Sequence, residues 1–372
     1  MKKNHLKVKY SLIDILNICL EKNIPFVSYR MPGEKNINTW IQLSGKFNFH
    51  ENVKEVIDKT GFVYAPFHRE TNFPIIFFEP ELIFENGDFD ESLIDEISSK
   101  PPLYPEYDFE TPFEIKKADY LDQAKSYIDS FDGNFQKAVL SRVQIEKRPE
   151  SFNIGEFFMH LQKSYPNAYC HLINIPGTGT WTGATPETLL RIDKNIAQTI
   201  SLAATQPYFE KDQKLNWDKK ELEEQQIVTD YIEAIFEKYK IEDYNKEETK
   251  NMIAGNAVHL ATKFSFQKSP LENQLGEFLS DLHPTPAVCG LPKYKALELI
   301  LKTEKHNREF YSGFLGTLNL NDKTDLFVNL RCMKILPDKL ALFVGGGLTK
   351  GSVPEKEWVE TELKAGTLLK II

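Results

Sequence analysis

The chain has 372 residues, of which 41% are hydrophobic and 12% aromatic, so it can bury a large core and lacks the composition of a disordered protein. Its formal net charge is −9, and its lysines and arginines are scattered along the sequence, which argues against a nucleic-acid-binding surface. A small anionic substrate would need local positive groups or a metal ion, because the overall field does not attract it.

The N-terminal segment and the cysteines bear on the cellular location. The N-terminal segment interrupts its apolar positions with Asp14 and Glu21, unlike a signal peptide, and predicts an amphipathic helix. The sequence contains no run of 18 apolar residues, so we expect no membrane span. The four cysteines form no CxxC pair, so neither a zinc site nor a disulfide framework is expected, and reduced thiols favour the cytoplasm.

The first third of the chain predicts one helix followed by short strands. Strand-like runs rich in β-branched and aromatic residues are PFVSYRM, GFVYAPF and PIIFFEPELIF. The segment from Ser98 to Thr111 is rich in proline and polar residues and is the best candidate for a linker. We therefore expect residues 1–110 to form an N-terminal α+β part of the same globule, without a catalytic motif, and residues 111–372 to form the main part.

Helices and strands then mix without regular βαβ alternation. We expect helices at about 115–130, 153–164, 218–240 and 354–369, and strands at KAVLSRVQIEK, AYCHLINI, TLLRI, FYSGFLGTLNL, LFVNLRCMKI and LALFVGG. Consecutive strands joined by short turns predict antiparallel pairing, so an α+β fold is favoured over a doubly wound sheet. Neither GxGxxG nor GxxxxGK[ST] occurs, so no nucleotide-binding motif is present.

Two predicted helices carry glutamates at helical spacing. Glu221 and Glu224 are three residues apart, as are Glu357 and Glu360, and Lys364 follows four residues later. Residues with these spacings share one face of a helix. Acidic runs of this kind are most often solvated surface stripes. The alternative is a site for a hard cation, because Mg²⁺ binds carboxylate oxygens.

Two further residues are candidates for proton transfer. Lys137 lies in an otherwise apolar strand, where a lysine can act as a general base. The ordinary alternative is a lysine on an edge strand that prevents aggregation. Glu187 follows a strand in the segment GATPETLL. Loops often hold catalytic acids, although a glutamate that ends a turn is more common.

Candidate anion-binding groups lie later in the sequence. Arg331, in the predicted strand VNLRCMKI, needs a partner, for which a carboxylate of a ligand or of a buried glutamate is suitable. His259 by itself is more often structural than catalytic. The stretch GGGLTKGSVP, which includes Gly345, predicts a glycine-rich loop whose N–H groups can approach an anion, although a tight turn explains the glycines equally well.

The order of these motifs resembles the chorismate-utilising family, which includes isochorismate, salicylate, anthranilate and aminodeoxychorismate synthases. The resemblance covers most of residues 113–372 and runs through KAVLSR, GATPE, SLAAT, KKELEEQQIV, VHLAT, LHPTPAVCGLP, REFYSGFLG, LRCMKI and LFVGGGLTKGSVPEKEWVETELK. It implies an α+β fold with a large antiparallel sheet core wrapped by helices, in which residues 111–372 form the chorismate-binding catalytic core.

The resemblance also implies a magnesium site. Glu224 and Glu360 match the Mg²⁺ ligands, and Glu221 and Glu357 match the acidic residues that bind water on the metal. Lys364 matches a residue beside the metal and the substrate carboxylate. The cofactor implied by the resemblance is therefore Mg²⁺.

The substrate implied by the resemblance is chorismate. Arg331 and Tyr311 match the positions that hold its enolpyruvyl carboxylate, with help from the backbone of Gly345. The full set of implied substrate-binding positions is Ala204, His259, Ala287, Tyr311, Arg331, Gly345 and Lys364.

The implied reaction is that of an isochorismate synthase. In relatives that add water to the ring, the position of Lys137 holds a lysine, which would deprotonate the water, while Glu187 would protonate the departing hydroxyl. The loop containing Ala287 and Val288 also resembles that of isochorismate synthases. A monomer without a glutaminase subunit is expected. The alternatives are a salicylate synthase, which goes on to eliminate pyruvate, an aminodeoxychorismate synthase, and a catalytically silent chorismate-binding protein.

Several positions depart from the family pattern. Ala204 stands where the family usually has glycine, and Gln225 replaces the histidine that commonly follows the metal-binding glutamate. Cys289 and Gly346 also differ from the usual small residues. None of these changes removes a proposed catalytic group. The sequence leaves open whether the product would feed menaquinone or a catechol siderophore.

Overall fold

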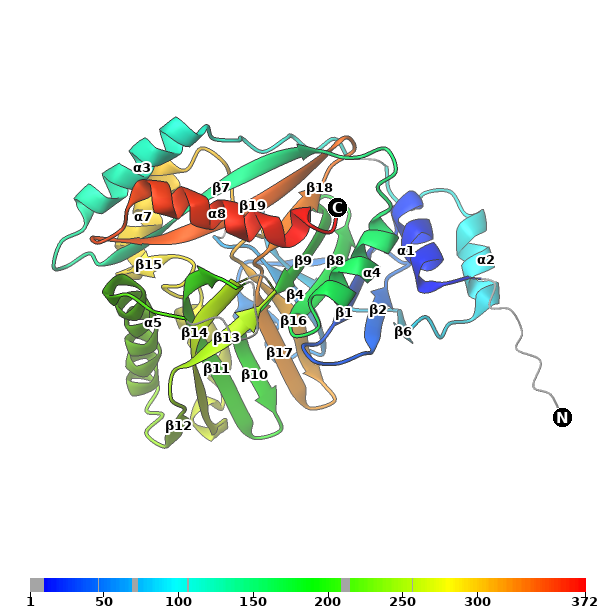
Figure 1. Ribbon diagram of the computed structural model, residues 1–372. Helices are drawn as coiled ribbons and strands as arrows, with labels where there is room; N and C mark the ends of the chain where they lie inside the picture. The colour runs from blue at the N-terminus through cyan, green and yellow to red at the C-terminus, as the bar shows by residue number, and fades with distance from the viewer. Residues whose placement is uncertain (1–9, 46, 69–72, 106, 209–214, 256) are drawn as a thin grey trace.

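The computed structural model describes residues 10–45, 47–68, 73–105, 107–208, 215–255 and 257–372. In this part of the chain, two large sheets pack against each other and helices cover their outer faces (Figure 1). Each described strand pairing is antiparallel. The α+β fold predicted from strands joined by short turns is therefore confirmed.

The first sheet has nine strands among the described residues and combines early and late parts of the sequence. In spatial order they are β15 (Gly290–Leu291), β7 (Lys137–Lys147), β19 (Lys339–Thr349), β18 (Cys332–Ile335), β9 (Gly179–Thr185), β8 (Tyr169–Ile175), β1 (Phe26–Arg30), β2 (Ile37–Ile41) and β6 (Leu82–Glu85). Because β1 pairs with β8, strands from the first hundred residues extend the sheet that the later strands form.

The second sheet has ten strands among the described residues. Its order is β12 (Tyr244–Lys246), β14 (Ala257–Gln267), β11 (Ile196–Pro207), β10 (Thr188–Asp193), β17 (Lys323–Val328), β16 (Phe314–Leu320), β4 (Gly61–Ala65), β5 (Ile75–Phe78) and β3 (Asn48–His50), with β13 (Lys250–Ala254) beside β14. The pairing of β4 with β16 joins early and late segments here too.

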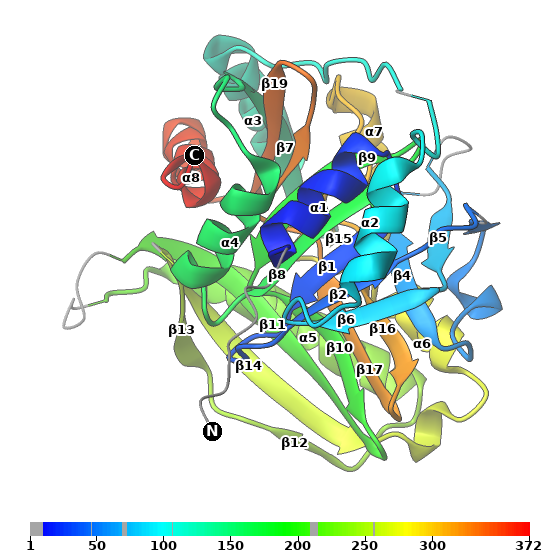
Figure 2. The same cartoon turned by 90° about the vertical axis from the view of Figure 1, so that its right-hand side faces the viewer.

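Helices form the two outer layers. They are α1 (Leu12–Glu21), α2 (Glu91–Ser99), α3 (Lys117–Ser130), α4 (Ile154–Ser164), α5 (Lys219–Lys238), α6 (Leu275–Leu282), α7 (Lys293–Thr303) and α8 (Pro354–Leu369). Apolar residues of α1, α2, α4 and the end of α8 pack on the first sheet (Figure 2), whereas α5 and α6 pack on the second. None of the described helices is long and apolar enough to cross a membrane.

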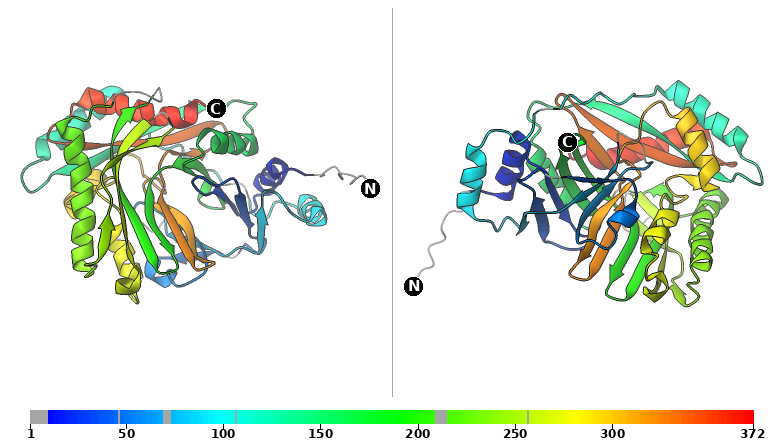
Figure 3. Two further views of the ribbon diagram at one scale, coloured as in Figure 1. Left: turned by 60° about the horizontal axis from the view of Figure 1, so that its bottom comes forward. Right: turned by 180° about the vertical axis from the view of Figure 1, so that it is seen from behind.

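The two sheets face each other (Figure 3), and an aromatic core fills part of the space between them. Tyr29, Trp40 and Tyr169 project from the first sheet, and Phe62 and Phe327 project from the second. The rings of Tyr169 and Phe327 stack with centroids 4.2 Å apart, and Trp40 meets Phe62 edge to face at 6.3 Å. Burial of these rings provides a large apolar contribution to stability and fixes the spacing of the two sheets.

The helix boundaries agree closely with the sequence predictions. The helix predicted at 218–240 is α5, and Asp218 caps it by accepting a hydrogen bond from the backbone N–H of Glu221. The helix predicted at 354–369 is α8, which begins with Pro354, a residue suited to the first helical turn. These two predictions are confirmed.

The segment LFVNLRCMKI, predicted as one strand, is instead divided between the two sheets. β17 ends at Val328 in the second sheet, and β18 begins at Cys332 in the first sheet. Arg331 lies between them with a φ of 49°, which an extended strand does not accommodate. The prediction of a single strand was wrong because a largely apolar segment carries no information about the sheet to which each half belongs.

Candidate active site

A hollow of about 660 Å³ is lined by strands of both sheets together with α5 and α8. Ten of the residues predicted from the sequence line it, namely Glu187, Ala204, Glu224, His259, Ala287, Tyr311, Arg331, Gly345, Glu360 and Lys364. Two more, Glu221 and Glu357, line a neighbouring hollow that shares Glu360. The sequence motifs therefore converge in space, although they are spread over about half of the chain.

The first three glycines of GGGLTKGSVP belong to a strand, not to the predicted loop, whereas Gly351 lies in the turn that follows it. Gly345, Gly346 and Gly347 lie inside β19 and pair in register with β7. A Cβ atom on Gly347 would overlap the carboxylate of Glu224 and would lie 2.7 Å from Cε of Lys137. The missing side chains thus allow charged groups to approach the strand closely.

Lys137 occupies an interior position in the first sheet. It begins β7, between β15 and β19, and its side chain is fully buried, so the edge-strand interpretation is wrong. Its Nζ lies 2.9 Å from Oε1 of Glu224. Among the described residues, no group accepts a well-aligned hydrogen bond from this ammonium. Lys137 is not among the residues that line the hollow, but it lies directly behind Glu224, which is.

Glu224 and Glu357 are both buried, so the interpretation as a solvated acidic stripe is wrong for these two residues. Burial raises the pKa of Glu224, but Lys137 and Lys220 more than offset this effect and bring the pKa below its ordinary value. Burial and the nearby Glu360 raise the pKa of Glu357 above its ordinary value. One carboxylate is thus held ionised and the other is biased towards its protonated form.

Two lysines contact the acidic groups, and one of them, Lys220, bridges Glu224 and Glu357. Nζ of Lys220 lies 3.3 Å from Oε2 of Glu224 on the same helix and 3.1 Å from Oε1 of Glu357 on α8. On α8 itself, Lys364 contacts Glu360 at 2.6 Å and donates a hydrogen bond of 2.8 Å to the carbonyl of Gly345. The positive charges therefore balance the acidic groups that α5 and α8 bring together.

Glu221 has a different position from the other three glutamates. Its carboxylate accepts a hydrogen bond from the backbone N–H of Asp218 at 2.9 Å, which completes a capping box at the start of α5. It also accepts hydrogen bonds from the amide of Gln206. Glu221 therefore stabilises the helix end beside the carboxylate cluster.

The donor set is compatible with Mg²⁺, which prefers oxygen ligands and retains several waters. Glu357 Oε2 is buried without a hydrogen-bond partner, and the side-chain oxygens of Glu357 and Glu360 both flank Gly346. Over the described residues, no three acidic, histidine or cysteine side chains already form a metal cage. A cation here would therefore draw its protein ligands from two helices that Lys220 now connects.

Glu187 lies in the short connection between β9 and β10 and is buried. Burial raises its pKa to about 7, even though Lys137, Lys364 and Arg331 act in the opposite direction. A carboxyl group with this pKa is substantially protonated at neutral pH and can donate its proton. The position of Glu187 in a loop between strands agrees with the sequence prediction.

Arg331 faces the hollow from the crossing between the two sheets. Its guanidinium donates to Oγ1 of Thr367 at 3.2 Å and contacts Nε2 of His259 at 3.3 Å. No described carboxylate forms an ion pair with it. Glu187 and Glu360 line the same hollow but are not paired with the guanidinium, which leaves it suited to an incoming anion.

His259 supports Arg331 in its neutral form. Burial and the adjacent Arg331 lower the pKa of His259 to about 3. Its Nδ1 lies 2.8 Å from the carbonyl oxygen of Ala204, so Nδ1 carries the proton and Nε2 accepts from the guanidinium. The histidine therefore links the guanidinium to β11.

Sequence reasoning missed two residues that organise the site, Lys220 and Thr367. Lys220 precedes Glu224 by four residues, a spacing typical of ordinary helix-surface ion pairs. Thr367 follows Lys364 by three residues on one face of α8 and anchors Arg331. The helical spacing was the available signal in both cases, but only the burial of the partners distinguishes these residues from surface residues.

Comparisons with known proteins identify the family of the chain. The profile of the family described as "Chorismate binding enzyme" matches residues 83–372. The chain belongs to the chorismate-binding enzyme family. Isochorismate synthase EntC of Escherichia coli K12 is 29% identical over 242 residues, and isochorismate synthase DhbC of Bacillus subtilis is 29% identical over 255 residues. These matches cover 63% and 64% of this chain, and 62% and 63% of the relatives.

A solved structure supports the same fold. The crystal structure of DhbC from Bacillus anthracis aligns with a TM-score of 0.77 and 24% sequence identity. The alignment covers 96% of this chain and 99% of that chain, so it includes the N-terminal strands as well as the site. The large antiparallel sheets and surrounding helices are therefore the fold of chorismate-binding enzymes.

Two departures from the chorismate-binding pattern have structural explanations. Ala204 has a φ of 59° at a register shift between β11 and β14, a conformation that glycine adopts without strain. Gln225 is buried, and its amide donates to the carbonyl and hydroxyl of Ser201 and to Thr262. Ala204 therefore keeps a backbone shape suited to glycine, and Gln225 joins α5 to the second sheet.

Proposed function

We propose that this chain is a Mg²⁺-dependent isochorismate synthase, which converts chorismate into isochorismate. One arrangement carries the proposal: Lys137 and Glu187, both buried, belong to one site with Arg331, whose guanidinium has no carboxylate partner among the described residues. The similarity to two proteins named isochorismate synthases supports this choice within the family.

The binding of chorismate would use its two carboxylates. Arg331 would bind the enolpyruvyl carboxylate, because its remaining N–H donors suit a planar anion. Tyr311, whose ring stacks on Phe343 with centroids 5.7 Å apart, would add its hydroxyl to the same group. The carboxylate on the ring would lie towards Lys364 and the acidic cluster.

The proposed reaction replaces one hydroxyl group by another across an allylic system. Lys137, in its unprotonated form, accepts a proton from a water molecule as the water oxygen bonds to ring C2. Both ring double bonds shift by one position, the C4–O bond breaks, and Glu187 gives its proton to the departing hydroxyl, which leaves as water. The atoms of one water enter and those of another leave, so the product is an isomer of the substrate.

The metal requirement rests on the carboxylate cluster. Glu224 and Glu360 would hold Mg²⁺, with Glu357 beside them, and the ion would neutralise and orient the ring carboxylate when bound. In this proposal, side chains of the protein transfer the protons and the metal ion does not. Mg²⁺ would therefore assist binding and charge stabilisation, whereas Lys137 and Glu187 would perform acid–base chemistry.

The use of water as the nucleophile bears on the partners that the enzyme needs. An enzyme that adds water needs no ammonia channel, so we propose a monomer that acts without a glutaminase subunit.

All four cysteines are buried and unpaired. This arrangement is compatible with a reducing cytoplasm, which is the location that we propose.

The test is product analysis with purified protein. Chorismate would be incubated with and without MgCl₂, with and without ammonium, and the products separated by chromatography. We expect isochorismate only when Mg²⁺ is present, and no incorporation of ammonia. The variants Lys137→Ala and Glu187→Gln should each lower kcat by about 10²–10⁴-fold.

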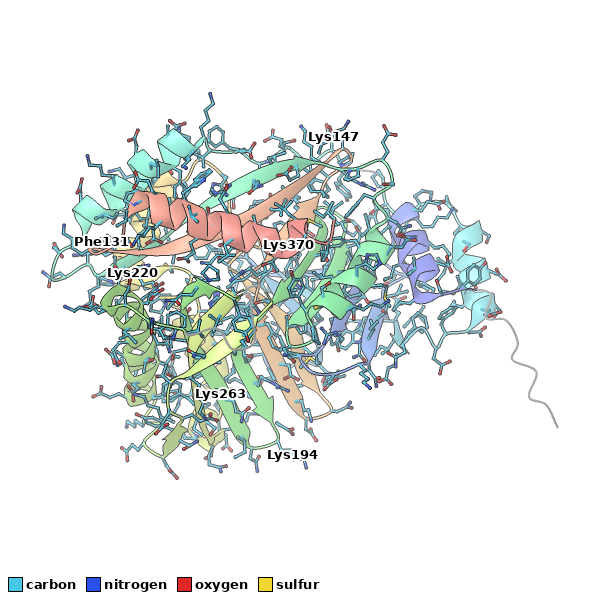
Figure 4. All side chains as sticks on the ribbon, in the orientation of Figure 1. Phe131, Lys147, Lys194, Lys220, Lys263 and Lys370 are labelled. Atoms are coloured by element: carbon cyan, nitrogen blue, oxygen red, sulfur yellow. The ribbon has the colours of Figure 1, made fainter. Side chains whose placement is uncertain are left out.

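Lys147 provides a matched control for Lys137. It ends the same strand and is exposed, and Figure 4 labels it far from α5. Lys147→Ala should leave turnover unchanged. Release of pyruvate with salicylate would reassign the chain as a salicylate synthase, and an aminated product would indicate an aminodeoxychorismate synthase. Binding of chorismate without any turnover would identify a silent binding protein.

A further inference from the structure

Lys220 occupies the junction between the two helices that carry the acidic cluster. It lies in the first turn of α5, and Figure 4 labels it below the N-terminal half of α8. Its Nζ lies 3.3 Å from Glu224 and 3.1 Å from Glu357, whose side chains are 10% and 4% exposed. A single ammonium therefore bridges two nearly buried carboxylates on different helices.

Lys220 contacts both carboxylates at distances longer than those of a tight ion pair. Charge-assisted N–H···O bonds are commonly about 2.7–2.9 Å long, and both distances from Lys220 exceed that range. By comparison, Lys364 approaches Glu360 to 2.6 Å. An ammonium held between two acceptors at longer distances is less firmly fixed than one that is bound to a single acceptor.

The carboxylate cluster also has unused binding capacity. Oε2 of Glu357 is buried and accepts no hydrogen bond within the described part of the chain. A buried carboxylate oxygen without a donor is costly, so it favours a ligand that supplies positive charge. Lys220 occupies Oε1 of the same carboxylate. The cluster therefore has an acceptor oriented for a second cation.

Lys220 also has room to withdraw. It lines the neighbouring hollow of about 1370 Å³, together with Glu221, Glu357 and Glu360. Its side chain is 20% exposed, in contrast with Lys137, which is fully buried. The four-carbon stem of a lysine is flexible and its head group is readily hydrated. The ammonium can therefore move into the hollow without separating α5 from α8.

From these observations we propose that Lys220 is a tethered counter-cation of the metal site: it pairs with Glu224 and Glu357 when no divalent ion is bound, and a divalent ion displaces it. This inference rests on the metal site of the proposed function and extends it to a residue that regulates metal affinity. The ammonium and a dication compete for the same carboxylate charge. The carboxylates therefore face a cation in both the occupied and the vacant state, and the cost is a weaker affinity for the ion.

The test measures metal binding directly, without chorismate. MgCl₂ would be titrated by calorimetry into the full-length metal-free protein, its Lys220→Met variant and a Lys219→Met control. Lys219 is adjacent on α5, but its side chain is 91% exposed. We expect Lys220→Met to lower the Kd for Mg²⁺ by about tenfold or more, because the competing charge is gone, and Lys219→Met to change it less than about twofold.

Thermal unfolding gives an independent readout. Without Mg²⁺, Lys220→Met should unfold at a lower temperature than the parent protein, because its carboxylates lose a buried partner. Saturating Mg²⁺ should raise the unfolding temperature of Lys220→Met by more than it raises that of the parent. If Lys220→Met does not fold, Lys220→Gln keeps a neutral hydrogen-bond donor and serves in both experiments.

The outcomes separate this inference from the proposed function. Mg²⁺ binding to the parent protein with equal or weaker affinity in Lys220→Met would overturn the counter-cation role and make Lys220 a structural bridge. Absence of Mg²⁺ binding in the parent and in every variant would overturn the metal site itself. Binding that appears only in Lys220→Met would support the counter-cation role in its strongest form.

Discussion

The aromatic core and the charged hollow lie between the same two sheets but have opposite chemistry. In the aromatic core, rings such as Tyr169 and Phe327 stack across the gap. In the hollow, glycines of β19 leave space that Lys137 and Glu224 enter. Tyr311 and Phe343 stack at the boundary and belong to both regions. One architecture thus supports stability at one place and chemistry at another.

The difference shows how a protein can hold charges out of water. Burial of rings gains free energy, whereas burial of charged groups costs free energy and shifts pKa values. The aromatic core fixes the spacing of the sheets, so the hollow keeps its shape even though its own lining includes costly groups. Substitutions in the two regions should therefore affect different measurements.

The largest expected effect is on stability in the aromatic core. Phe62 is fully buried on β4 and contacts the rings of Tyr29 and Trp40. Phe62→Ala should lower the free energy of unfolding by about 3–5 kcal/mol, while kcat of the folded fraction changes little. Urea denaturation and turnover measurements would check both parts. Phe49→Ala, on exposed Phe49 of the same sheet, is the control and should cost less than about 1 kcal/mol.

A smaller effect should appear in the pH dependence of stability in the hollow. The ordinary pKa of glutamate is 4.5, and burial raises that of Glu187 to about 7. The folded state therefore binds more protons between these values, and its stability falls as pH rises through this window. The loss is at most about 3 kcal/mol, at 1.36 kcal/mol per pKa unit.

Glu187→Gln removes this titration. Between pH 4.5 and pH 8, the parent protein should lose up to about 3 kcal/mol more stability than the variant, because glutamine stays neutral throughout. Urea denaturation of both proteins at the two pH values, without Mg²⁺, measures the difference. Equal losses would mean that the carboxyl group ionises normally in the folded state, contrary to its role as a proton donor.

The smallest effect concerns the backbone at the edge of the hollow. A left-handed conformation costs about 1–2 kcal/mol for a residue with a side chain, and Ala204 adopts it. Ala204→Gly should therefore stabilise the protein by about 1 kcal/mol. Ala203→Gly, one residue earlier in the same strand, should instead destabilise it by a similar amount. Thermal unfolding of the pair distinguishes them, and effects of the same sign would contradict the strain at Ala204.

The fold was largely predictable because its elements have clear local signals. The apolar strand that begins at Lys137 and the long helix capped by Asp218 were both identified with nearly correct ends. Antiparallel pairing followed from the short connections. The division of the apolar run at Arg331 was not predictable, because both halves have the composition of a buried strand and only the tertiary structure places them in different sheets.

The candidate site was predictable as a set of residues but not as an arrangement. The resemblance to a family supplied Glu224, Glu357 and Glu360 together, whereas spacing alone favoured a solvated surface. Burial distinguishes these interpretations, and burial depends on contacts between distant segments. Lys220 escaped notice for the same reason, since a lysine four residues before a glutamate is common on exposed helices.

The pairing of β7 with β19 joins segments that are distant in the sequence, since Lys137 lies opposite Thr349. Closing such a long loop costs more entropy than forming a local hairpin such as β8 with β9. We therefore expect the hairpins to form first and the long-range pair to form late in folding. The lysines and glutamates of the interior then stay hydrated for most of the folding process, and they leave water only when their partners of opposite charge are already adjacent.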